Sequence, residues 1–163
     1  MIVGGGQENQ RRSGTENVAN IVGSSIALSL AIQNLSETKN SCKLLRDEIT
    51  SRILENIPRT TLNGHPTKRL VNNANISFHG LEGESILLGL DLAGISASSG
   101  SACTSGSLEP SHVLLATGQS AEIAQSSVRF TVGYENTKQD VDYLLSVIVP
   151  LVDKLRELSS ISV

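Results

Sequence analysis

Apolar side chains recur every three to four positions near both ends of the chain and every second position in parts of its middle. The first spacing is typical of a helix that buries one face, and the second of a half-buried strand. Because helices and strands are interleaved, with no internal repeat and no linker, we expect one domain of the α+β or α/β class, with a small sheet packed against several helices. The expected helices are 16–34, 36–57, 82–92, 111–117, 120–125 and one that opens at 137–140, and the expected strands are 60–64, 74–78, 95–98 and 128–132.

Local signals set several of these boundaries. Ser13 and Glu16 have the S-x-x-E spacing of a capping box, so the first helix is expected to begin there. The pair Ser36-Glu37 has the character of a second helix start, because an acidic group is favoured in the first turn. Pro58 ends the second helix, and Ser120 is expected to cap the helix 120–125. Thr137 and Asp140 open the last helix, in which Pro150 predicts a kink or a register break.

Composition narrows the classes of partner. The chain has 163 residues, a formal net charge of −3 and 2% aromatic residues. The scarcity of aromatics argues against stacking of single-stranded nucleic acid, and the slight acidity argues against a broad phosphate-binding surface, so no nucleic-acid partner is expected.

Polar residues interrupt every apolar run before about 18 residues, so we expect no membrane span, and the N-terminus lacks the pattern of a secretory signal. Two cysteines are too few for a disulfide framework, and neither they nor the histidines have metal-ligand spacing; we expect no metal and a cytoplasmic protein.

The segment from Ser98 to His112 is rich in Ser and Gly and carries Cys103 near its middle. A run this polar buries too little apolar surface to offset its own ordering, so Cys103 is expected to be exposed on a mobile loop. Exposed thiols are reactive, which makes Cys103 a candidate nucleophile, although a surface cysteine without function fits the spacing equally well. His112 is a candidate base that the loop sequence does not place. Cys42, by contrast, is expected to be a partly buried structural thiol in a helix.

The glycine-rich start of the chain, from Gly4 to Thr15, is a second candidate site. It combines freed backbone amides, a hydroxyl, Arg12 and a helix start, which together suit an anion or a phosphate. It has neither the dinucleotide fingerprint nor the ending of a P-loop. The residues alone favour a solvated terminus ahead of a capped helix.

Arg129 lies within the apolar strand 128–132, where an unpaired charge is costly, so it is expected to face a carboxylate. A structural Asp or Glu is the commoner partner. The other candidate is the carboxylate of a bound amino acid, which a planar guanidinium holds with two parallel hydrogen bonds.

These segments occur in an order that resembles one enzyme family. The motifs are, in order, GGGQE, RRSGTEN, NGH, NNANISF, EGES, SSGSACTSGSLEPSHVLLA and SSVRFTVG. They resemble the C-terminal part of a pyridoxal-phosphate cysteine desulfurase of the NifS/IscS type, in the class V aminotransferase superfamily. The resemblance covers nearly the whole chain, and the cysteine loop is its most specific element. It implies the small C-terminal domain of a fold-type I pyridoxal-phosphate enzyme at 16–163, with the catalytic loop at about 98–112, and a remnant of the large cofactor domain at 1–15.

The resemblance also implies a role for each matching residue. Cys103 would attack the sulfur of L-cysteine bound to pyridoxal phosphate, which leaves a persulfide on Cys103 and yields L-alanine. Arg129 would hold the substrate carboxylate. Thr15, with Arg12 nearby, would bind the cofactor phosphate of the neighbouring subunit in a homodimer. A sulfur-acceptor or iron–sulfur scaffold protein would then take the sulfur.

One departure from the family limits these expectations. In this family the lysine that bonds the cofactor lies upstream of the GGGQE segment, and no lysine here sits in a matching motif. We therefore expect a C-terminal fragment that has no meaningful desulfurase activity alone and exposes an apolar patch where a large domain would pack. Two alternatives stay open: a non-enzymatic domain that associates through residues 16–57, and a stand-alone persulfide carrier that uses Cys103 without a cofactor.

Overall fold

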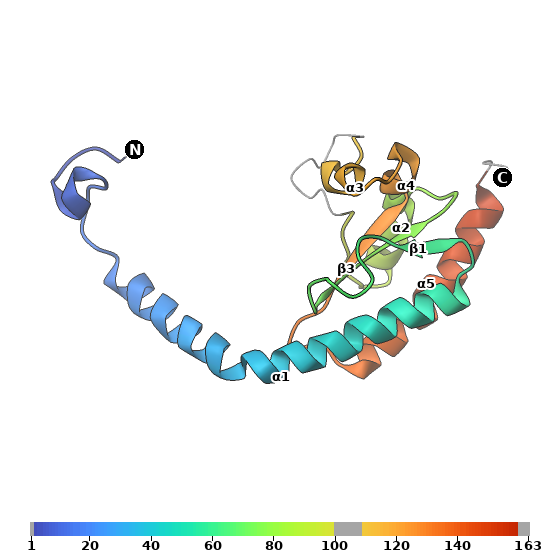
Figure 1. Cartoon of the computed structure of the whole chain (residues 1–163), viewed down its shortest axis with the longest axis horizontal. Coiled ribbons are helices and arrows are strands. Elements are labelled where there is room, and N and C mark those ends of the chain that lie inside the picture. The colour runs from blue at the N-terminus through green and yellow to red at the C-terminus, as the bar shows by residue number, and fades with distance from the viewer. Residues whose placement is uncertain (1, 100–108, 160–163) are drawn as a thin grey trace. The chain divides into compact units, whose positions relative to one another are not determined.

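The computed structural model describes residues 2–99 and 109–159, and Figure 1 labels their helices and strands. The contacts of the chain group into two units, Met1–Glu37 and Thr38–Val163. The second unit contains the sheet and the helices that pack on it. In chain order the elements are η1 (Gln7–Gln10), α1 (Val18–Asn56), β1 (Thr60–Leu62), β2 (Asn73–Phe78), α2 (Gly83–Leu92), α3 (His112–Ala116), α4 (Ala121–Gln125), β3 (Ser127–Thr131) and α5 (Lys138–Leu158).

Helix α1 is continuous where the sequence pattern predicted two helices. Ser36 and Glu37 lie inside it, so the predicted second start is wrong. Both side chains are exposed, and polar side chains that face solvent do not interrupt a helix. The end of α1 at Asn56 confirms the stop expected from Pro58.

The start of α1 also differs from the prediction. The Oδ1 atom of Asn17 accepts a hydrogen bond from the backbone N–H of Asn20 at 3.2 Å, which is the bond of an N-cap residue. The Ser13 hydroxyl instead donates to the carbonyl of Gly5 at 2.8 Å. The predicted capping box of Ser13 and Glu16 is therefore wrong, because Ser13 is engaged in the turn before the helix.

The three strands form an antiparallel sheet in the order β1-β2-β3, with β2 in the middle. The strands expected at 60–64, 74–78 and 128–132 are confirmed to within two residues. Residues 95–98 form no strand, and Ser98 makes only an isolated bridge to Arg129 of β3. Asn75 pairs with Arg129 and Ile76 with Val128, so alternate pairs point to opposite faces of the sheet.

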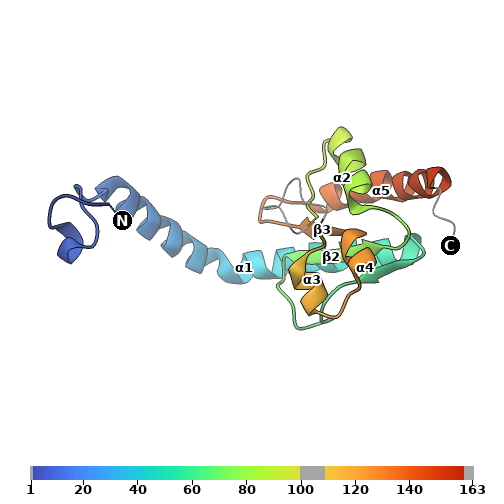
Figure 2. The same ribbon diagram turned by 90° about the horizontal axis from the view of Figure 1, so that it is seen from above.

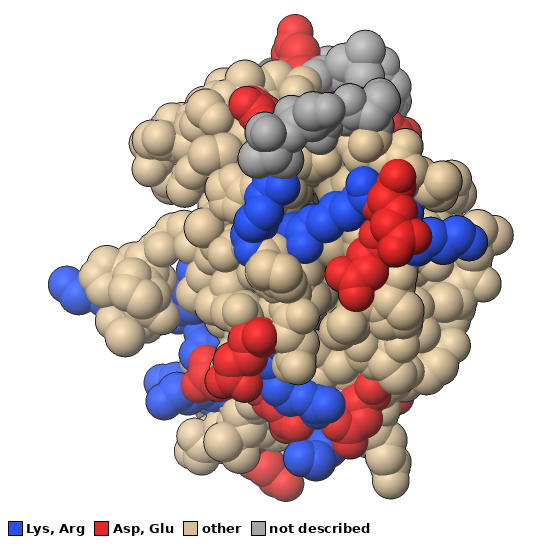
Figure 3. All heavy atoms as spheres, turned by 90° about the vertical axis from the view of Figure 1, so that its right-hand side faces the viewer, with Lys and Arg blue, Asp and Glu red and all other residues tan. Residues whose placement is uncertain are grey.

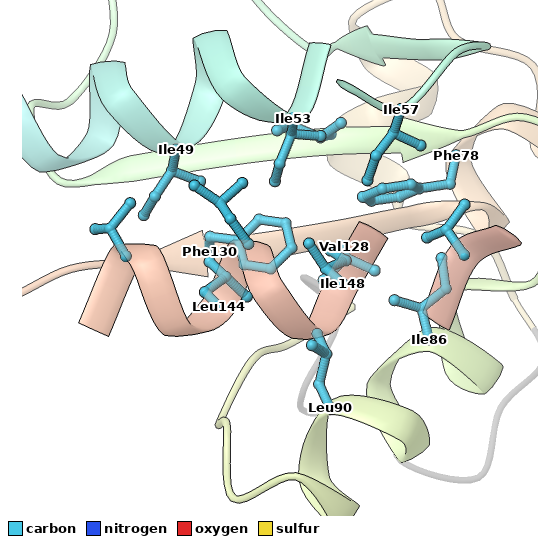
Figure 4. Packing of buried hydrophobic residues seen from close by; sticks show 14 of the residues in the cluster. Ile49, Ile53, Ile57, Phe78, Ile86, Leu90, Val128, Phe130, Leu144 and Ile148 are labelled. Atoms are coloured by element: carbon cyan, nitrogen blue, oxygen red, sulfur yellow. The ribbon is translucent and has the colours of Figure 1, made fainter. Parts of the chain in front are cut away.

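The hydrophobic core lies between the apolar face of this sheet and three helices. Each large side chain fully removed from water stabilises the fold by roughly 1.5–3 kcal/mol, so this cluster fixes β2 and β3 firmly. The opposite face of these two strands carries polar side chains and is not part of the core. Figure 4 shows Ile49, Ile53 and Ile57 directed toward Phe78, Val128 and Phe130 of the sheet and Leu144 and Ile148 of α5, with Ile86 and Leu90 of α2 beside them.

The caps of α4 and α5 follow the sequence signals. The Ser120 hydroxyl accepts from the N–H of Ile123 at 3.3 Å, and Thr137 and Asp140 form a reciprocal capping box. Pro150 lies inside α5 without ending it. Ile148 and Val152, on either side of Pro150, are both fully buried, so the predicted register break does not occur.

The backbone at the start of α2 packs closely against the first residue of β3. A Cβ added at Gly83 would lie 2.6 Å from the carbonyl oxygen of Ser127 and 3.0 Å from that of Gln125. Real Cβ atoms do not come so close to backbone oxygen, so only glycine fits at this position. The EGES segment therefore begins its helix against the sheet.

The part of α1 that belongs to the first unit exposes its apolar side chains. Every large apolar residue of this stretch is more than half exposed, and the expectation that a large domain would pack there stays a prediction. By length and composition alone α1 could also cross a membrane, since it contains an 18-residue window of mean hydropathy 1.4 with none of the window buried. The sequence predicted no membrane span because polar residues interrupt its apolar runs, whereas the mean hydropathy of the window includes those polar residues. The exposed residues are Val18, Ile21, Val22, Ile26, Leu28, Leu30, Ile32 and Leu35.

Candidate functional site

A row of three polar side chains crosses the polar face of the sheet. Asn75 of β2 lies opposite Arg129 of β3, and Ser98 pairs with Arg129 on its other side. The backbone N–H of Arg129 donates to the Ser98 carbonyl at 2.6 Å, and that of Ser98 donates back at 3.1 Å. Residues paired in this way have their side chains on the same face, so Asn75, Arg129 and Ser98 form one polar row.

Arg129 is half-buried and, within residues 2–99 and 109–159, has no carboxylate at ion-pair distance. Its guanidinium donates one long hydrogen bond, from Nη2 to the Ser98 hydroxyl at 3.4 Å. Its Nε is buried without a partner. The structural Asp or Glu that the sequence analysis favoured as its partner is therefore not found in the part of the chain described. A buried, unpaired donor on a charged group is costly, and a carboxylate ligand would satisfy it.

A chain of buried hydrogen bonds runs along the same face beside this row. The Nδ2 of Asn63 donates to Oδ1 of Asn75 at 2.6 Å and to the Ser77 hydroxyl at 2.8 Å. The Ser77 hydroxyl donates in turn to the carbonyl of Ile123, in α4, at 2.9 Å. Figures 1 and 2 show α4 and α3 on the side of the sheet away from α1 and α5, which is the side of this polar face.

Arg69 closes the other end of this hydrogen-bond chain by donating from Nη2 to the carbonyl of Asn63. Burial lowers the pKa of Arg69, and the positive charge of nearby Arg46 lowers it further. Arg46 itself is buried and donates to the Leu70 carbonyl at 2.9 Å. The loop between β1 and β2 is thus held by two arginines, Arg69 from within the loop and Arg46 from α1.

Cys103 lies outside the described residues, and so does most of the Ser- and Gly-rich segment from Ser98 to His112. The described residues that flank it are Ser99, next to the Ser98–Arg129 bridge, and Glu109, two residues before the buried Ser111. His112 begins α3 and is exposed. Cys42 was expected to be partly buried, and the structure buries it more fully: it is 2% exposed in the core, and its Sγ lies 3.8 Å from the Val132 carbonyl.

The N-terminal turn, in the first unit, holds the other two predicted site residues. Nη1 of Arg12 donates to the carbonyls of Gly14 and Thr15, both at 3.1 Å. The N–H of Gly14 donates to Oε1 of Gln7 at 3.2 Å, so the turn is closed by its own side chains. Thr15 is exposed. A hollow of about 220 Å³ next to it is lined by Arg12, Gly14, Asn17 and Ile21 and by two acidic residues, Glu8 and Glu16. Arg12 and Thr15 are therefore neighbours, in a different unit from Arg129.

Charges of both signs are interspersed on the face of the molecule shown in Figure 3. The ion pairs that the structure contains fit this pattern, since Glu48 contacts both Arg52 and Lys138, and Arg52 also contacts Asp142. On this face the described charges alternate in sign and therefore form no continuous positive patch.

Sequence reasoning found Arg129 because a charge inside an apolar strand stands out, but it missed Asn63, Asn75 and Ser98. The only signal for Asn75 was the alternation of polar and apolar residues in NANISF, which marks a polar face without saying what lies opposite. Asn63 and Ser98 come from a turn and a loop, and only the folded chain brings them to that face.

Comparison with known proteins identifies the class. The family Aminotransferase class-V matches residues 4–144, and the chain belongs to this family. Enzymes of this family use pyridoxal phosphate. Among curated relatives, the chain is 49% identical over 162 residues to the cysteine desulfurase IscS of Methanosarcina thermophila and 48% identical over 159 residues to that of Dictyoglomus turgidum.

Solved structures agree with this assignment. A NifS-like protein from Rickettsia africae matches 94% of the chain with a TM-score of 0.80 and 32% identity. A second structure, titled NifS-like protein, matches 95% with a TM-score of 0.81 and 33% identity. The expected small α+β domain of a NifS/IscS-type enzyme is thereby confirmed. The chain spans about 40% of the length of the two curated relatives and 39% of these two structures.

Proposed function

We propose that this chain is the part of a cysteine desulfurase that binds the carboxylate of L-cysteine and receives its sulfur. The observation that carries the proposal is Arg129, a half-buried guanidinium with a buried unpartnered Nε and, in the described part of the chain, no carboxylate beside it. The backbone of this arginine is bonded on one side to Ser98, at the entry to the segment that contains Cys103. Cys103 lies five positions after Ser98 in the sequence, so the covalent chain keeps their Cα atoms within about 18 Å of one another.

Cys103 is the proposed sulfur acceptor. The bond between the β-carbon and the sulfur of L-cysteine breaks, the sulfur bonds to Sγ of the Cys103 thiolate, and the β-carbon takes up a proton to give L-alanine. Arg129 holds the substrate carboxylate with two charge-assisted hydrogen bonds, which orients the amino acid for this transfer. Cys42 takes no part, because its thiol is enclosed in the core.

The group that supplies the chemistry is pyridoxal phosphate, which acts as an electron sink for the amino acid when bound. In this chain Arg12 and Thr15 are the residues that would hold its phosphate, because the Arg12 guanidinium lies against Thr15 and the Thr15 side chain is exposed. We propose that they serve the neighbouring subunit of a homodimer. Of the lysines, Lys138 is paired with Glu48, and none lies in the polar row or at the N-terminal turn.

The remaining parts of the proposal concern organisation and partners. Residues 1–15 contribute to the cofactor domain, and residues 16–163 form the small domain with the catalytic segment at about 98–112. The sulfur passes to an acceptor or iron–sulfur scaffold protein in the cytoplasm. Without a cofactor lysine in a matching position, this chain alone does not turn over L-cysteine.

The experiment uses a chimera in which this chain replaces the matching segment of the Methanosarcina thermophila relative. We expect it to convert L-cysteine to L-alanine and to lose that activity on Cys103→Ala, while Arg129→Met raises KM at least tenfold because a charge-assisted hydrogen bond is lost. Arg52→Met is the matched control. It removes the surface ion pairs of Arg52 with Glu48 and Asp142 and should leave the activity and KM unchanged. Full activity of the Cys103→Ala chimera would refute the proposal.

A further inference from the structure

The amide of Asn75 has an orientation that the surrounding hydrogen bonds determine. The carbonyl of Ile123 can only accept, so the Ser77 hydroxyl, 2.9 Å away, must give its proton there. The oxygen of Ser77 is then an acceptor for Asn63, which must present its NH₂ group at 2.8 Å. The same NH₂ group lies 2.6 Å from Asn75, which must therefore present its Oδ1 to Asn63.

The consequence is that the Nδ2 of Asn75 points away from Asn63. Nδ2 has no hydrogen-bond partner within the described residues, although the Oδ1 of the same amide is held. Asn75 is half-buried on the polar face, directly opposite Arg129. Side chains paired across antiparallel strands start about 4.5–5.5 Å apart at their Cβ atoms. An NH₂ group with two donors thus stands next to the guanidinium whose Nε is also unpartnered.

We propose that Asn75 is a second binding residue for the substrate carboxylate, and that Asn63 and Ser77 are positioning residues that fix its amide with the donor outward. This inference rests on the proposed function, in which Arg129 binds the same carboxylate. One carboxylate has about four lone-pair sites, so it accepts from a guanidinium and an amide together. Neither donor has a competing acceptor in the described structure apart from the long bond of Arg129 to Ser98. The two strands that carry the donors are fixed by the core behind them, which preorganises the pair.

The test is the KM for L-cysteine in the chimera, measured for Asn75→Ala. Loss of a hydrogen bond to a charged group should raise KM about tenfold or more. Asn73→Ala is the matched control, because Asn73 lies on the same strand and face but opposite Thr131, and it should leave KM unchanged. L-cysteine methyl ester lacks the carboxylate charge, so with it the difference between Asn75→Ala and the unchanged chimera should fall to less than twofold. A merely structural role of Asn75 would affect both substrates alike.

A second readout needs no turnover. In this chain, titration with L-alanine should shift the side-chain NH₂ resonance of Asn75, identified by its loss in Asn75→Asp, and Arg129→Met should abolish the shift. If Arg129→Met raises KM and Asn75→Ala does not, the role of Asn75 is refuted while the proposed function stands. If Arg129→Met itself leaves KM unchanged, the proposed site fails.

Discussion

Ser98 and Arg129 exchange both of their backbone hydrogen bonds, at 2.6 Å and 3.1 Å, and so extend the polar face of the sheet by one residue. This bridge ties the entry of the Cys103 segment to the residue proposed to bind the substrate carboxylate. It also aligns Ser98 with Asn75, so that three polar side chains share one row. On the other face of the strand that carries Arg129, Val128 and Phe130 are buried in the core, which holds the strand and its polar side chains in place.

The lack of an ion partner for Arg129 predicts an unusual stability result. Arg129→Met keeps the apolar stem and removes a charge that nothing in the described chain neutralises, so the free energy of unfolding should change by less than about 1 kcal/mol or rise. Arg46→Met is the contrasting variant, because Arg46 is buried and its loss leaves the Leu70 carbonyl without its donor. It should destabilise the chain by about 1–3 kcal/mol. Urea unfolding of the two variants measures both changes. Equal losses in the free energy of unfolding would show that Arg129 has a structural partner.

Gly83 should tolerate no side chain. Gly83→Ala places a Cβ against the carbonyl oxygens of Ser127 and Gln125, so α2 must move away from β3. We expect a loss of roughly 1–3 kcal/mol in the free energy of unfolding, as for other overpacked sites. Ser85→Ala, an exposed change in the same helix, should stay within about 0.5 kcal/mol. An unchanged melting temperature for Gly83→Ala would contradict the close approach.

The capping box of α5 predicts a pH dependence. The backbone N–H of Thr137, and then its hydroxyl, donate to the carboxylate of Asp140 and hold the pKa of that group below its ordinary value. A carboxyl whose pKa is lowered by folding stabilises the fold above its unfolded-state pKa and loses that contribution as the pH falls through the folded-state pKa. Asp140→Asn should therefore be less stable than the unchanged chain at pH 7, and the difference should shrink in acid. A difference in urea midpoint that stays constant between neutral and strongly acidic pH would rule out this linkage.

The exposed apolar residues of the first unit predict self-association. Exposed apolar surface of this kind favours association. In a solution of this chain alone, the available partner is a second copy of the chain. Sedimentation velocity should show concentration-dependent association that Ile21→Lys with Ile26→Lys reduces. Because α1 also passes the length and composition test for a spanning helix, the same samples should be mixed with lipid vesicles. A strictly monomeric chain at high concentration would count against the exposed patch as an association surface.

The parts of the fold that the sequence predicted are those with local signals. The Thr137–Asp140 cap, the Ser120 cap and the alternating strands each depend on residues within one turn or one strand. The merging of two predicted helices into α1 could not be foreseen, because Ser36-Glu37 is compatible with both a start and an exposed interior turn. At the candidate site Arg129 was visible in the sequence. Its neighbours Asn75 and Ser98 were not, because strand register and the isolated bridge join residues more than 30 positions apart.

The most direct test of the account is the intact mass of this chain after incubation with L-cysteine, pyridoxal phosphate and a separately produced cofactor-bearing segment of a related desulfurase. We predict one added sulfur atom that a thiol reductant removes. The addition should be absent from Cys103→Ala and retained in Cys42→Ala, because the Cys42 thiol is enclosed in the core. No added sulfur on the unchanged chain, with the two segments shown to associate, would contradict the assignment of Cys103 as the sulfur acceptor.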